Sequence, residues 1–308
     1  MRTVYLGTST FAVDVLGALA TSPHRPALVV TPPDRPKGRG RKMAPPPVAL
    51  AARDLGLELH QAETVNDETS LERIDEAAPE AICVCEFGQL IKEPLLSRFL
   101  MLNVHPSLLP RWRGAAPIER ALTAGDTVIG VTIFKLTAGL DSGPVAAMRR
   151  EPIRPDDTAG SLAARLAPLG ARLLIETLDR TEAGALELTE QAEEGVTYAE
   201  KIRPEERRLD PRRPAADLER IVRALTPGIG AYLELDNGER LGVASPAVDA
   251  SGPAVGELVA HDAQLALGCA EGTLLVSQVK PAGRRLMSAS DYQRGHRLPR
   301  RVIPPSTG

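Results

Sequence analysis

The sequence predicts an α/β protein with two parts, a Rossmann-like domain with a mostly parallel sheet and a C-terminal, OB-fold-like small β-barrel. Short apolar runs alternate with helical patterns over the first part of the chain, which is typical of strands joined by crossover helices. A charged stretch rich in Arg, Glu and Pro follows at 187–216. Beyond it, short strand patterns separated by turn residues indicate a small barrel.

The elements of the first domain follow from the spacing of its apolar residues. Leucines recur at helical spacing in 161–178, whereas 81–85 is a continuous apolar run, as expected for a buried strand. The same criteria predict strands at 3–6, 27–30, 57–60, 81–85, 129–136 and 145–148. They predict helices at 11–21, 48–55, 71–78, 117–124 and 161–178.

The second domain is predicted to contain one helix and a set of short strands. The helix covers 215–225, and the strands lie at 232–235, 240–244, 256–260, 264–266 and 274–280. The stretch before them lacks apolar periodicity and is rich in charge and proline, which is typical of a linker. We therefore expect a first domain at 1–186, a linker at 187–206 and a second domain at 207–308.

Composition excludes several classes of protein. Of the 308 residues, 43% are hydrophobic and 25% are charged, which fits a globular chain with two cores. The first residues fit a strand rather than a signal peptide, and no apolar run approaches the roughly 20 residues of a membrane span. The three cysteines lack the spacing of a zinc site or a disulfide framework. We therefore expect a cytoplasmic monomer that binds neither metal nor membrane.

Charge is distributed unevenly along the chain. The formal net charge is −3, but residues 201–308 hold 16 Lys and Arg against 13 Asp and Glu. The stretch 34–42 holds five basic side chains among prolines and glycines. By composition alone such a loop is a solvated surface segment, although Arg-rich loops also bind phosphates and stack on unpaired bases. The pattern is compatible with a polyanionic partner and does not require one.

The most informative stretch is 103–118, which reads Asn-Val-His-Pro-Ser-Leu-Leu-Pro-Arg-Trp-Arg-Gly-Ala-Ala-Pro-Ile. Polar loops at the ends of strands carry the chemistry of α/β folds. Asn103 and His105 are two residues apart, so an extended backbone places both side chains on one face. An Asn N–H stabilises an oxygen that becomes anionic, and a His donates to the same oxygen or moves a proton near neutral pH.

A carboxylate partner for His105 is available in Asp141, within the turn Gly139-Leu140-Asp141-Ser142-Gly143. A carboxylate fixes the tautomer of a histidine and raises its proton affinity. Taken singly, a loop histidine is most often a surface or core residue, and an aspartate between glycines is most often a turn residue. Thirty-six residues separate His105 from Asp141, so spacing alone does not join them.

Two other kinds of active site are disfavoured. Ser107, His105 and Asp141 are the residue types of a hydrolase triad, but no Gly-x-Ser-x-Gly elbow is present. The serine also lies only two residues from the histidine. The turn after the first strand, Gly7-Thr8-Ser9-Thr10, lacks the Gly-x-Gly-x-x-Gly spacing of a dinucleotide site. We therefore expect neither an enzyme nucleophile nor a nicotinamide cofactor.

These residues carry a resemblance to a known family. The run NVHPSLLPRWRGAAPIE, followed by GVTIFKLTAGLDSGPV, closely resembles the signature of the methionyl-tRNA formyltransferase family of folate-dependent enzymes. Four further segments are similar to parts of that family: YLGTSTFAVDVL at the start, TPPDRPKGRGRKMAP at 31–45, TYAEKI at 197–202 and KPAGRRLMSASDY at 280–292. The resemblance therefore spans nearly the whole chain.

The resemblance implies transfer of a formyl group from 10-formyltetrahydrofolate, a co-substrate, to the α-amino group of initiator methionyl-tRNA. Asn103 and His105 then polarise the formyl oxygen, and Asp141 orients the site and handles the amine proton. The folate-binding residues that it implies are Phe87, Gly88, Ser107, Leu108, Leu109 and Pro110. The tRNA-binding residues that it implies are Arg35, Lys37, Arg39, Arg41, Lys42, Arg207, Arg208, Lys280, Arg284 and Arg285.

Three positions depart from the pattern of that family. Glu86-Phe87-Gly88 stands where the family usually has Ala-Tyr-Gly, so a phenol is lost and a carboxylate is added near the folate pocket. Pro106 replaces a frequent glycine and stiffens the loop. The stretch 226–231 lacks the tryptophan of the family.

Other functions of the same fold are alternatives. They are formyl transfer to a small amine such as an amino sugar, hydrolysis of 10-formyltetrahydrofolate, and a non-catalytic RNA-binding role. The basic loop and the second domain argue against the first two. The intact set of Asn103, His105 and Asp141 argues against the third.

Overall fold

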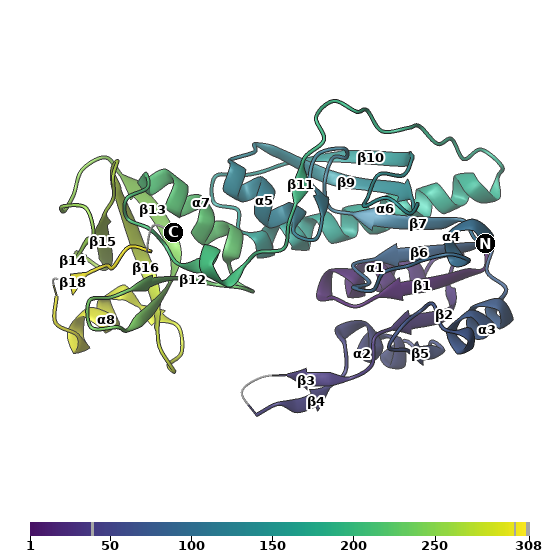
Figure 1. The fold of residues 1–308 in the computed structure, drawn as a ribbon, viewed down its shortest axis with the longest axis horizontal. Helices are drawn as coiled ribbons and strands as arrows, with labels where there is room; N and C mark the ends of the chain where they lie inside the picture. The colour runs from purple at the N-terminus through teal and green to yellow at the C-terminus, as the bar shows by residue number, and fades with distance from the viewer. Residues whose placement is uncertain (38–39, 299, 306–308) are drawn as a thin grey trace. The chain divides into compact units, whose positions relative to one another are not determined.

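The computed structural model describes residues 1–37, 40–298 and 300–305. The chain forms two compact units (Figure 1). Unit 1 consists of Met1–Pro117, Val128–Pro152 and Ala163–Ala199, and unit 2 consists of Ile118–Thr127, Ile153–Leu162 and the chain from Glu200 on. Each unit therefore combines segments that are distant in the sequence.

Unit 1 is built on a seven-stranded sheet with the order β10-β9-β7-β6-β1-β2-β5. The strands from β5 to β7 are parallel, whereas β9 runs antiparallel to β7 and β10. Their bounds are β1 (Thr3–Gly7), β2 (Pro26–Thr31), β5 (Leu59–Gln61), β6 (Ala81–Cys85), β7 (Met101–His105), β9 (Val128–Lys135) and β10 (Val145–Pro152). The predicted fold class is confirmed for this unit, and β7 extends into the polar stretch that was predicted as loop.

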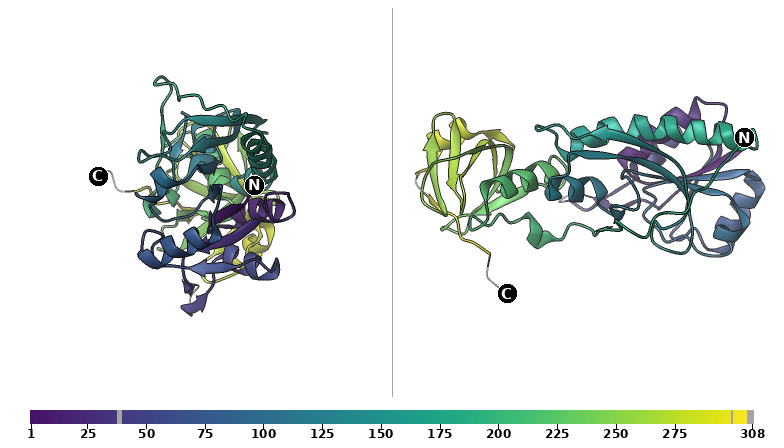
Figure 2. Two further views of the ribbon diagram at one scale, coloured as in Figure 1. Left: turned by 90° about the vertical axis from the view of Figure 1, so that its right-hand side faces the viewer. Right: turned by 90° about the horizontal axis from the view of Figure 1, so that it is seen from above.

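Helices cover both faces of this sheet (Figure 2). On one face lie α1 (Thr10–Ala20), α2 (Pro47–Asp54) and α6 (Ala159–Glu182), and on the other lie α3 (Glu68–Ala77) and α4 (Leu95–Arg98). The contact with α6 is close, because a Cβ at Gly170 would lie 2.8 Å from a methyl carbon of Val104 on β7. The apolar core under α3 and α4 includes Val4, Leu6, Leu28, Val30, Ile74, Ile82, Val84, Leu95 and Met101.

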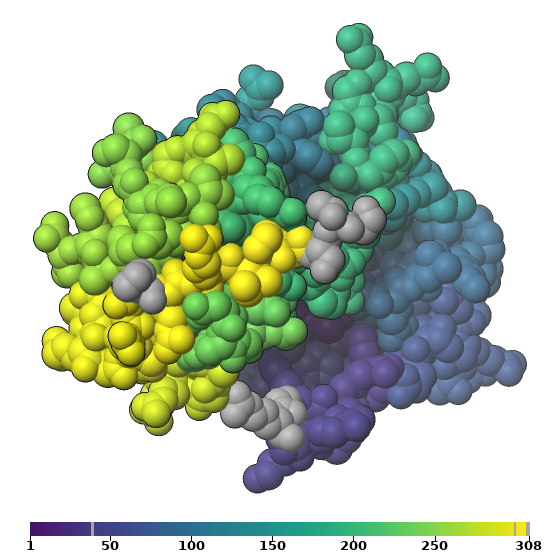
Figure 3. Space-filling model, turned by 60° about the vertical axis from the view of Figure 1, so that its left-hand side comes forward, coloured from purple at the N-terminus to yellow at the C-terminus, as the bar shows by residue number. Residues whose placement is uncertain are grey.

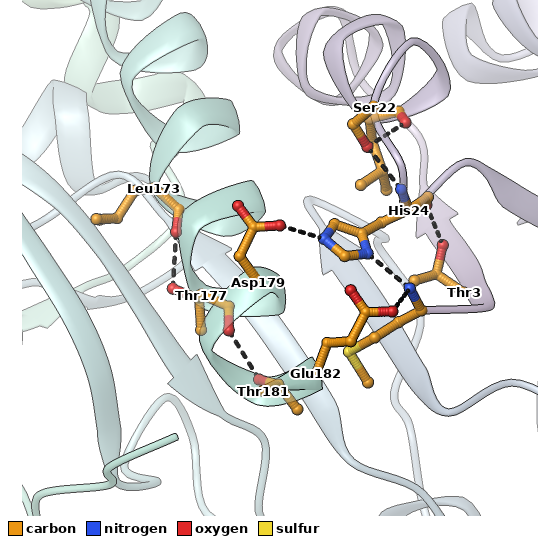
Figure 4. Close-up of polar contacts among 10 residues, drawn as sticks. Thr3, Ser22, His24, Leu173, Thr177, Asp179, Thr181 and Glu182 are labelled. Carbon is orange, nitrogen blue, oxygen red and sulfur yellow. Dashed lines mark hydrogen bonds and ion pairs between the residues drawn. The ribbon is translucent and has the colours of Figure 1, made fainter. Parts of the chain in front are cut away.

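A polar network around the buried His24 joins the turn after α1 to the C-terminal end of α6 (Figure 4). His24 is fully buried, and its Nε2 donates to Oδ1 of Asp179 at 2.8 Å. Its Nδ1 accepts from the amino group of Met1 at 2.9 Å, and its carbonyl oxygen accepts from the Thr3 hydroxyl at 2.8 Å. Because both ring nitrogens have partners, this polar contact holds α6 against the sheet without a desolvated, unpaired group.

Unit 2 contains a curled antiparallel sheet with the order β12-β13-β16-β15-β14-β18, and β17 pairs with β16. The bounds are β12 (Ala231–Glu234), β13 (Arg240–Asp249), β14 (Glu257–His261), β15 (Gln264–Gly268), β16 (Thr273–Pro281), β17 (Met287–Ser288) and β18 (Arg300–Arg301). A bridge between Leu235 and Val302 links the two edges, and Ile303 N–H donates to the Glu234 carbonyl oxygen at 2.8 Å. The sheet therefore curls back on itself, as the predicted small barrel requires.

Two helices pack on the sheet of unit 2. The predicted helix at 215–225 is α7 (Ala215–Leu225), whereas α8 (Ala289–Gly295) was missed because only Ala289 and Tyr292 anchor it in the core. The helix predicted at 117–124 is α5 (Pro117–Ala124). The last described residues lie on the surface of this unit (yellow in Figure 3), where Arg208 donates to the carbonyl oxygens of Ile303 and Pro304.

Two segments that were predicted as irregular hold regular structure. The loop at 31–47 contains a hairpin of β3 (Arg35–Lys37) and β4 (Lys42–Ala44). The linker at 187–206 contains β11 (Tyr198–Ala199), which pairs with β8 (Arg113–Gly114), and the 3-10 helix η1 (Pro204–Arg207). Composition concealed these elements because backbone pairing, rather than an apolar pattern, forms them.

A bidentate ion pair joins α5 to η1 within unit 2. Nη1 and Nη2 of Arg120 lie 2.5 and 3.2 Å from the two carboxylate oxygens of Glu206. The backbone N–H of Arg203 donates to the same carboxylate at 2.9 Å. The hydrogen bonds from Arg120 chiefly, with those from Arg203, outweigh desolvation and lower the pKa of Glu206 from 4.5 to about 2.

Glu206→Gln should therefore destabilise the protein most at neutral pH and less as the pH falls toward 2. The folded-state pKa lies below the unfolded value, so the carboxylate stabilises the fold above pH 4.5 and loses this effect as the pH falls toward 2. We expect a loss of about 1 kcal/mol at pH 7, because the pair is partly exposed. Thermal melting at pH 7 and pH 3, with the exposed Glu193→Gln as control, measures it. A deficit of equal size at both pH values would contradict this account.

Candidate active site

Asn103 and His105 lie at the carboxyl end of β7, within the strand rather than after it. They point to the same face, opposite Val104, which packs on α6. His105 is 4% exposed, and Asn103 is half-buried. Pairing of β7 with β6 on one side and β9 on the other holds this backbone extended, so the expected shared face is present.

The ring of His105 is held on two sides. Its Nε2 lies 2.9 Å from the carbonyl oxygen of Trp112, and a carbonyl only accepts, so this nitrogen carries a hydrogen. Its Nδ1 lies 3.7 Å from Oδ2 of Asp141. The Trp112 carbonyl, rather than the expected Asp141, therefore fixes the tautomer. Nδ1 is the nitrogen that is left to exchange a proton beside the carboxylate.

Asp141 reaches the site from the turn between β9 and β10. Its Oδ2 accepts from the backbone N–H of Gly114 at 2.8 Å, and its side chain is 15% exposed. Gly143 allows this turn to close, because a Cβ there would lie 1.8 Å from the carbonyl oxygen of Lys135. The antiparallel pair β9–β10 thus brings Asp141 to His105 across the intervening sequence.

The loop after β7 holds four of the residues implied to bind folate. Ser107 and Leu109 are buried, whereas Leu108 and Pro110 are half-buried. Thr132 on β9 fixes this loop, because its hydroxyl donates to the Ser107 carbonyl oxygen at 2.7 Å and accepts from the Leu109 N–H at 3.2 Å. The loop is therefore a preformed wall beside His105.

The Ser107 hydroxyl does not face His105 as a nucleophile would. It donates to the carbonyl oxygen of Arg111 at 2.7 Å, within the loop. The serine is also fully buried. Its hydroxyl therefore stabilises the loop, and this geometry argues against a hydrolase triad.

The end of β6 provides the other two residues implied to bind folate. Phe87 is buried, and Gly88 is exposed with a φ of +76°. Beside them, Glu86 is accessible to solvent as a residue, but protein atoms crowd its carboxyl group. This desolvation raises the pKa of Glu86, against the lowering effects of a hydrogen bond with Ser9 and of nearby His105. The carboxylate that departs from the family pattern thus lies next to the histidine.

In unit 1, the residues implied to bind tRNA lie on the hairpin β3–β4. Three of them are exposed there: Lys37, Arg41 and Lys42. Arg35 is also exposed and forms an ion pair with Glu63 at 2.5 Å. Arg39 lies outside the described residues. The hairpin therefore presents at least three cationic side chains to solvent.

In unit 2, the residues implied to bind tRNA separate into two groups. Three are exposed on β16 and the turn after it: Lys280, Arg284 and Arg285. Arg207 and Arg208 instead make contacts within the unit. Nε of Arg207 donates to the Gly230 carbonyl oxygen at 3.0 Å, and Arg208 pairs with Glu234 at 3.2 Å. These two half-buried guanidinium groups therefore have partners within unit 2, and their contact with tRNA stays a prediction.

Two side chains at the site were missed by the sequence analysis. Gln191 donates to the carbonyl oxygen of Asp141 at 2.8 Å, and Thr197 accepts from the N–H of Trp112 at 2.9 Å. Both lie in the charged stretch that was predicted as linker. The similarity of 197–202 to a family segment was the one signal for Thr197, and no sequence signal marked Gln191.

This arrangement suits transfer of an acyl-type group to an amine. The amide of Asn103 and the imidazole of His105 lie on one strand face, and the amide N–H can donate to an oxygen that gains negative charge. His105 can donate to the same oxygen from Nδ1 once that nitrogen carries a proton, because its Nε2–H is already bonded to the Trp112 carbonyl. Asp141 lies beside Nδ1, where a proton can be taken up. The attacking amine is itself the nucleophile, so the protein does not have to provide one.

Within residues 1–37, 40–298 and 300–305, the structure offers neither a metal-binding cluster nor a membrane-spanning helix. Among these residues, no three His, Cys, Asp or Glu side chains cluster so that they could hold a metal ion. None of the helices formed by them is both long and apolar enough to cross a membrane.

Comparisons with known proteins identify the family. The formyl transferase model matches residues 1–178, and the model of the formyl transferase C-terminal domain matches 201–297. The chain is 45% identical over 301 residues to the methionyl-tRNA formyltransferase of Halorhodospira halophila, covering 96% of this chain and 97% of the relative. It is 43% identical over 305 residues to that of Methylococcus capsulatus, covering 97% and 98%.

A solved structure supports the fold. HypX from Aquifex aeolicus, in complex with tetrahydrofolic acid, matches with a TM-score of 0.67 at 18% identity, over 95% of this chain and 46% of that chain. The chain thus spans about half the length of HypX, and this likeness concerns the fold alone. From the family models and the full-length relatives together, the chain belongs to the methionyl-tRNA formyltransferase family.

Proposed function

We propose that the protein transfers a formyl group from 10-formyltetrahydrofolate to the α-amino group of initiator methionyl-tRNA, giving N-formylmethionyl-tRNA for translation initiation. The observation that carries this proposal is the meeting of Asn103, His105 and Asp141 at one edge of the unit 1 sheet. Similarity to methionyl-tRNA formyltransferases over nearly the whole chain supports the choice of substrates. It also disfavours an amino sugar as the acceptor.

Asn103 and His105 stabilise the formyl oxygen in this proposal. When the amine attacks the formyl carbon, negative charge develops on that oxygen. The Asn103 amide donates to it directly, and His105 donates from Nδ1 when that nitrogen is protonated, because Nε2–H is already bonded to the Trp112 carbonyl. Donors that are already fixed in place stabilise such charge without reorganisation. The ring of His105 is fixed by its bond to Trp112, and the backbone of Asn103 is fixed by strand pairing.

Asp141 handles the proton that the attacking amine must lose. Its carboxylate lies 3.7 Å from Nδ1 of His105, so the proton has an acceptor in the carboxylate or in the imidazole. The Gly114 N–H and the turn glycines hold the carboxylate in this position.

The residues around the site fit a folate co-substrate, which supplies an activated formyl group. Leu108 and Pro110 offer apolar surface to a ring system, Phe87 supports the site from the core, and the absence of a side chain at Gly88 permits close approach of the backbone. We assign these residues, with Ser107 and Leu109 as the buried support of the wall, to the folate site.

The tRNA partner is assigned to basic surfaces in both units. In unit 1 we assign the hairpin β3–β4 and, from the sequence, Arg39, and in unit 2 we assign Lys280, Arg284 and Arg285, with Arg207 and Arg208 as flanking residues. We propose 1–186 as the catalytic domain, 187–206 as its linker and 207–308 as the tRNA-binding domain. A monomer in the cytoplasm suits an enzyme of translation, and we propose that state and compartment.

The direct test is a product assay. We expect N-formylmethionyl-tRNA when the protein is incubated with 10-formyltetrahydrofolate and charged initiator tRNA. A parallel reaction offers an amino-sugar nucleotide, and a third measures folate release without an acceptor. Formylation of the sugar with no labelled tRNA would overturn the proposal, and rapid hydrolysis without transfer would favour the hydrolase alternative.

Asp141→Asn should abolish turnover and leave tRNA binding nearly intact. The amide still accepts from the Gly114 N–H, so the turn is preserved, but it takes up no proton. We expect kcat to fall by roughly 100-fold or more. Single-turnover kinetics and tRNA binding measure the two effects, and an equal loss of both would make Asp141 a structural residue.

Removing charge from the hairpin should weaken tRNA binding alone. For Lys37→Ala combined with Lys42→Ala, we expect a higher KM for tRNA, an unchanged KM for folate and a salt dependence that is lower by about two phosphate contacts. Arg39→Ala should act in the same direction. The exposed Lys92→Ala serves as the matched control. If the hairpin variants bind tRNA as the control does, the hairpin is an ordinary solvated loop.

A further inference from the structure

The segment 189–199 lies along the catalytic loop of unit 1 rather than leading away from it. It is tied at its start to β10, where Val145 and Thr189 exchange backbone hydrogen bonds of 2.7 and 2.9 Å. It is tied at its end to β8, where Tyr198 and Ala199 pair with Arg113 and Gly114. Between these two backbone pairings lie Gln191 and Thr197, whose side chains bond to the turn of Asp141 and to the backbone of Trp112.

Gln191 uses the full hydrogen-bonding capacity of its amide at the turn of Asp141. Nε2 donates to the carbonyl oxygens of Asp141 and Gly143, each at 2.8 Å. Oε1 accepts from Nε and Nη2 of Arg113 at 3.0 and 2.7 Å. Only one orientation of the amide satisfies these partners, because a guanidinium only donates and a carbonyl only accepts. The turn is therefore fixed to the catalytic loop through Gln191.

Thr197 holds the backbone on which the tautomer of His105 depends. Its Oγ1 accepts from the N–H of Trp112 at 2.9 Å, and its carbonyl oxygen accepts from the N–H of Arg113 at 2.9 Å. Trp112 has a φ of +64°, an unfavourable region for a residue with a Cβ. This conformation directs its carbonyl oxygen to Nε2 of His105. The two bonds to Thr197 thus support a strained residue that orients the catalytic ring.

We propose that Gln191 and Thr197 are positioning residues for formyl transfer, Gln191 acting through the turn of Asp141 and Thr197 acting through the carbonyl of Trp112 on His105. This inference rests on the proposed function. Neither side chain touches the reacting atoms. Each fixes a backbone group whose displacement by a fraction of an ångström changes the geometry of the proton acceptor or the oxygen donors, and rates are sensitive to such changes.

The threonine is tested with two conservative variants. Thr197→Val keeps the shape and removes the acceptor oxygen, whereas Thr197→Ser keeps the oxygen. We expect Thr197→Val to lower kcat about 10-fold with both KM values within twofold, and Thr197→Ser to retain at least half of the activity. Thr181→Val removes a hydroxyl that donates to the Thr177 carbonyl oxygen on α6, and it is the matched control that should stay at the wild-type rate.

The pH profile of kcat separates positioning from a loss of fold. The charged groups beside His105 are Asp141 and Glu86, and both are unchanged in the threonine variants. We therefore expect the profile of Thr197→Val to be displaced because the bond to Nε2 is loosened, while Thr197→Ser and Thr181→Val keep the wild-type profile. A general loss of folded protein would lower the rate at every pH without displacing the profile.

The glutamine is tested with Gln191→Ala and Gln191→Glu. Gln191→Ala removes the bonds to the turn of Asp141 without adding a charge, whereas Gln191→Glu keeps the acceptor for Arg113, loses both N–H donors and also places a negative charge against the two turn carbonyls. We expect both variants to lose about 10- to 100-fold in kcat, while tetrahydrofolate binding and melting temperature stay near those of the wild type.

The results distinguish this inference from the proposed function. If the wild type forms no formylmethionyl-tRNA, the proposed function fails. If the wild type is active and Gln191→Ala and Thr197→Val keep its kcat and pH profile, the positioning roles alone are overturned. They are also overturned if kcat, tetrahydrofolate binding and melting temperature fall together, because that pattern marks a structural role.

Discussion

The hydrogen bond from Nε2 of His105 to the carbonyl oxygen of Trp112 is the interaction on which the active site depends. It leaves Nδ1 as the nitrogen that faces Asp141. The carbonyl is available because Trp112 adopts a φ of +64°, and Gly114 follows at +120°, where a Cβ would lie 2.9 Å from the Ala199 carbonyl oxygen. The sharp bend of this loop therefore fits against β11 and aims the carbonyl at the ring.

The site combines a strand that is held by sheet pairing with a turn that is held by hydrogen bonds from other segments. Asn103 and His105 belong to a strand that is paired on both sides, so their backbone has little freedom. Asp141 belongs to a turn, which is less constrained by itself. Hydrogen bonds from Gly114 and Gln191 supply the missing rigidity. Precise geometry at a turn thus depends on a segment from the far end of unit 1.

A second carboxyl group near the active site, that of Glu86, distinguishes this chain from the usual family pattern. The desolvated carboxyl group of Glu86 has a raised pKa and lies near His105, on the side of β6, whereas Asp141 approaches from β9–β10. The histidine therefore has two acidic side chains in its surroundings, of which Asp141 is the one at 3.7 Å. Outside the site, exposed lysines and arginines of the hairpin and of β16 provide the cations that a phosphate backbone requires.

The sequence by itself determined the fold class, most strand and helix positions, and the identity of Asn103, His105 and Asp141 as candidate residues. Apolar periodicity is sufficient for the elements and a local two-residue spacing for Asn103 and His105, whereas Asp141 was joined to them by the resemblance to the family. Tertiary structure decided what the chain brings together across long distances: Asp141 beside His105, the Trp112 carbonyl as the group that fixes the tautomer, and Gln191 and Thr197 as its supports. It also showed that Arg208 pairs with Glu234 and donates to the Ile303 carbonyl oxygen within unit 2. The physical reason is that these contacts use backbone carbonyls and fully paired polar side chains, which leave no pattern in composition or spacing.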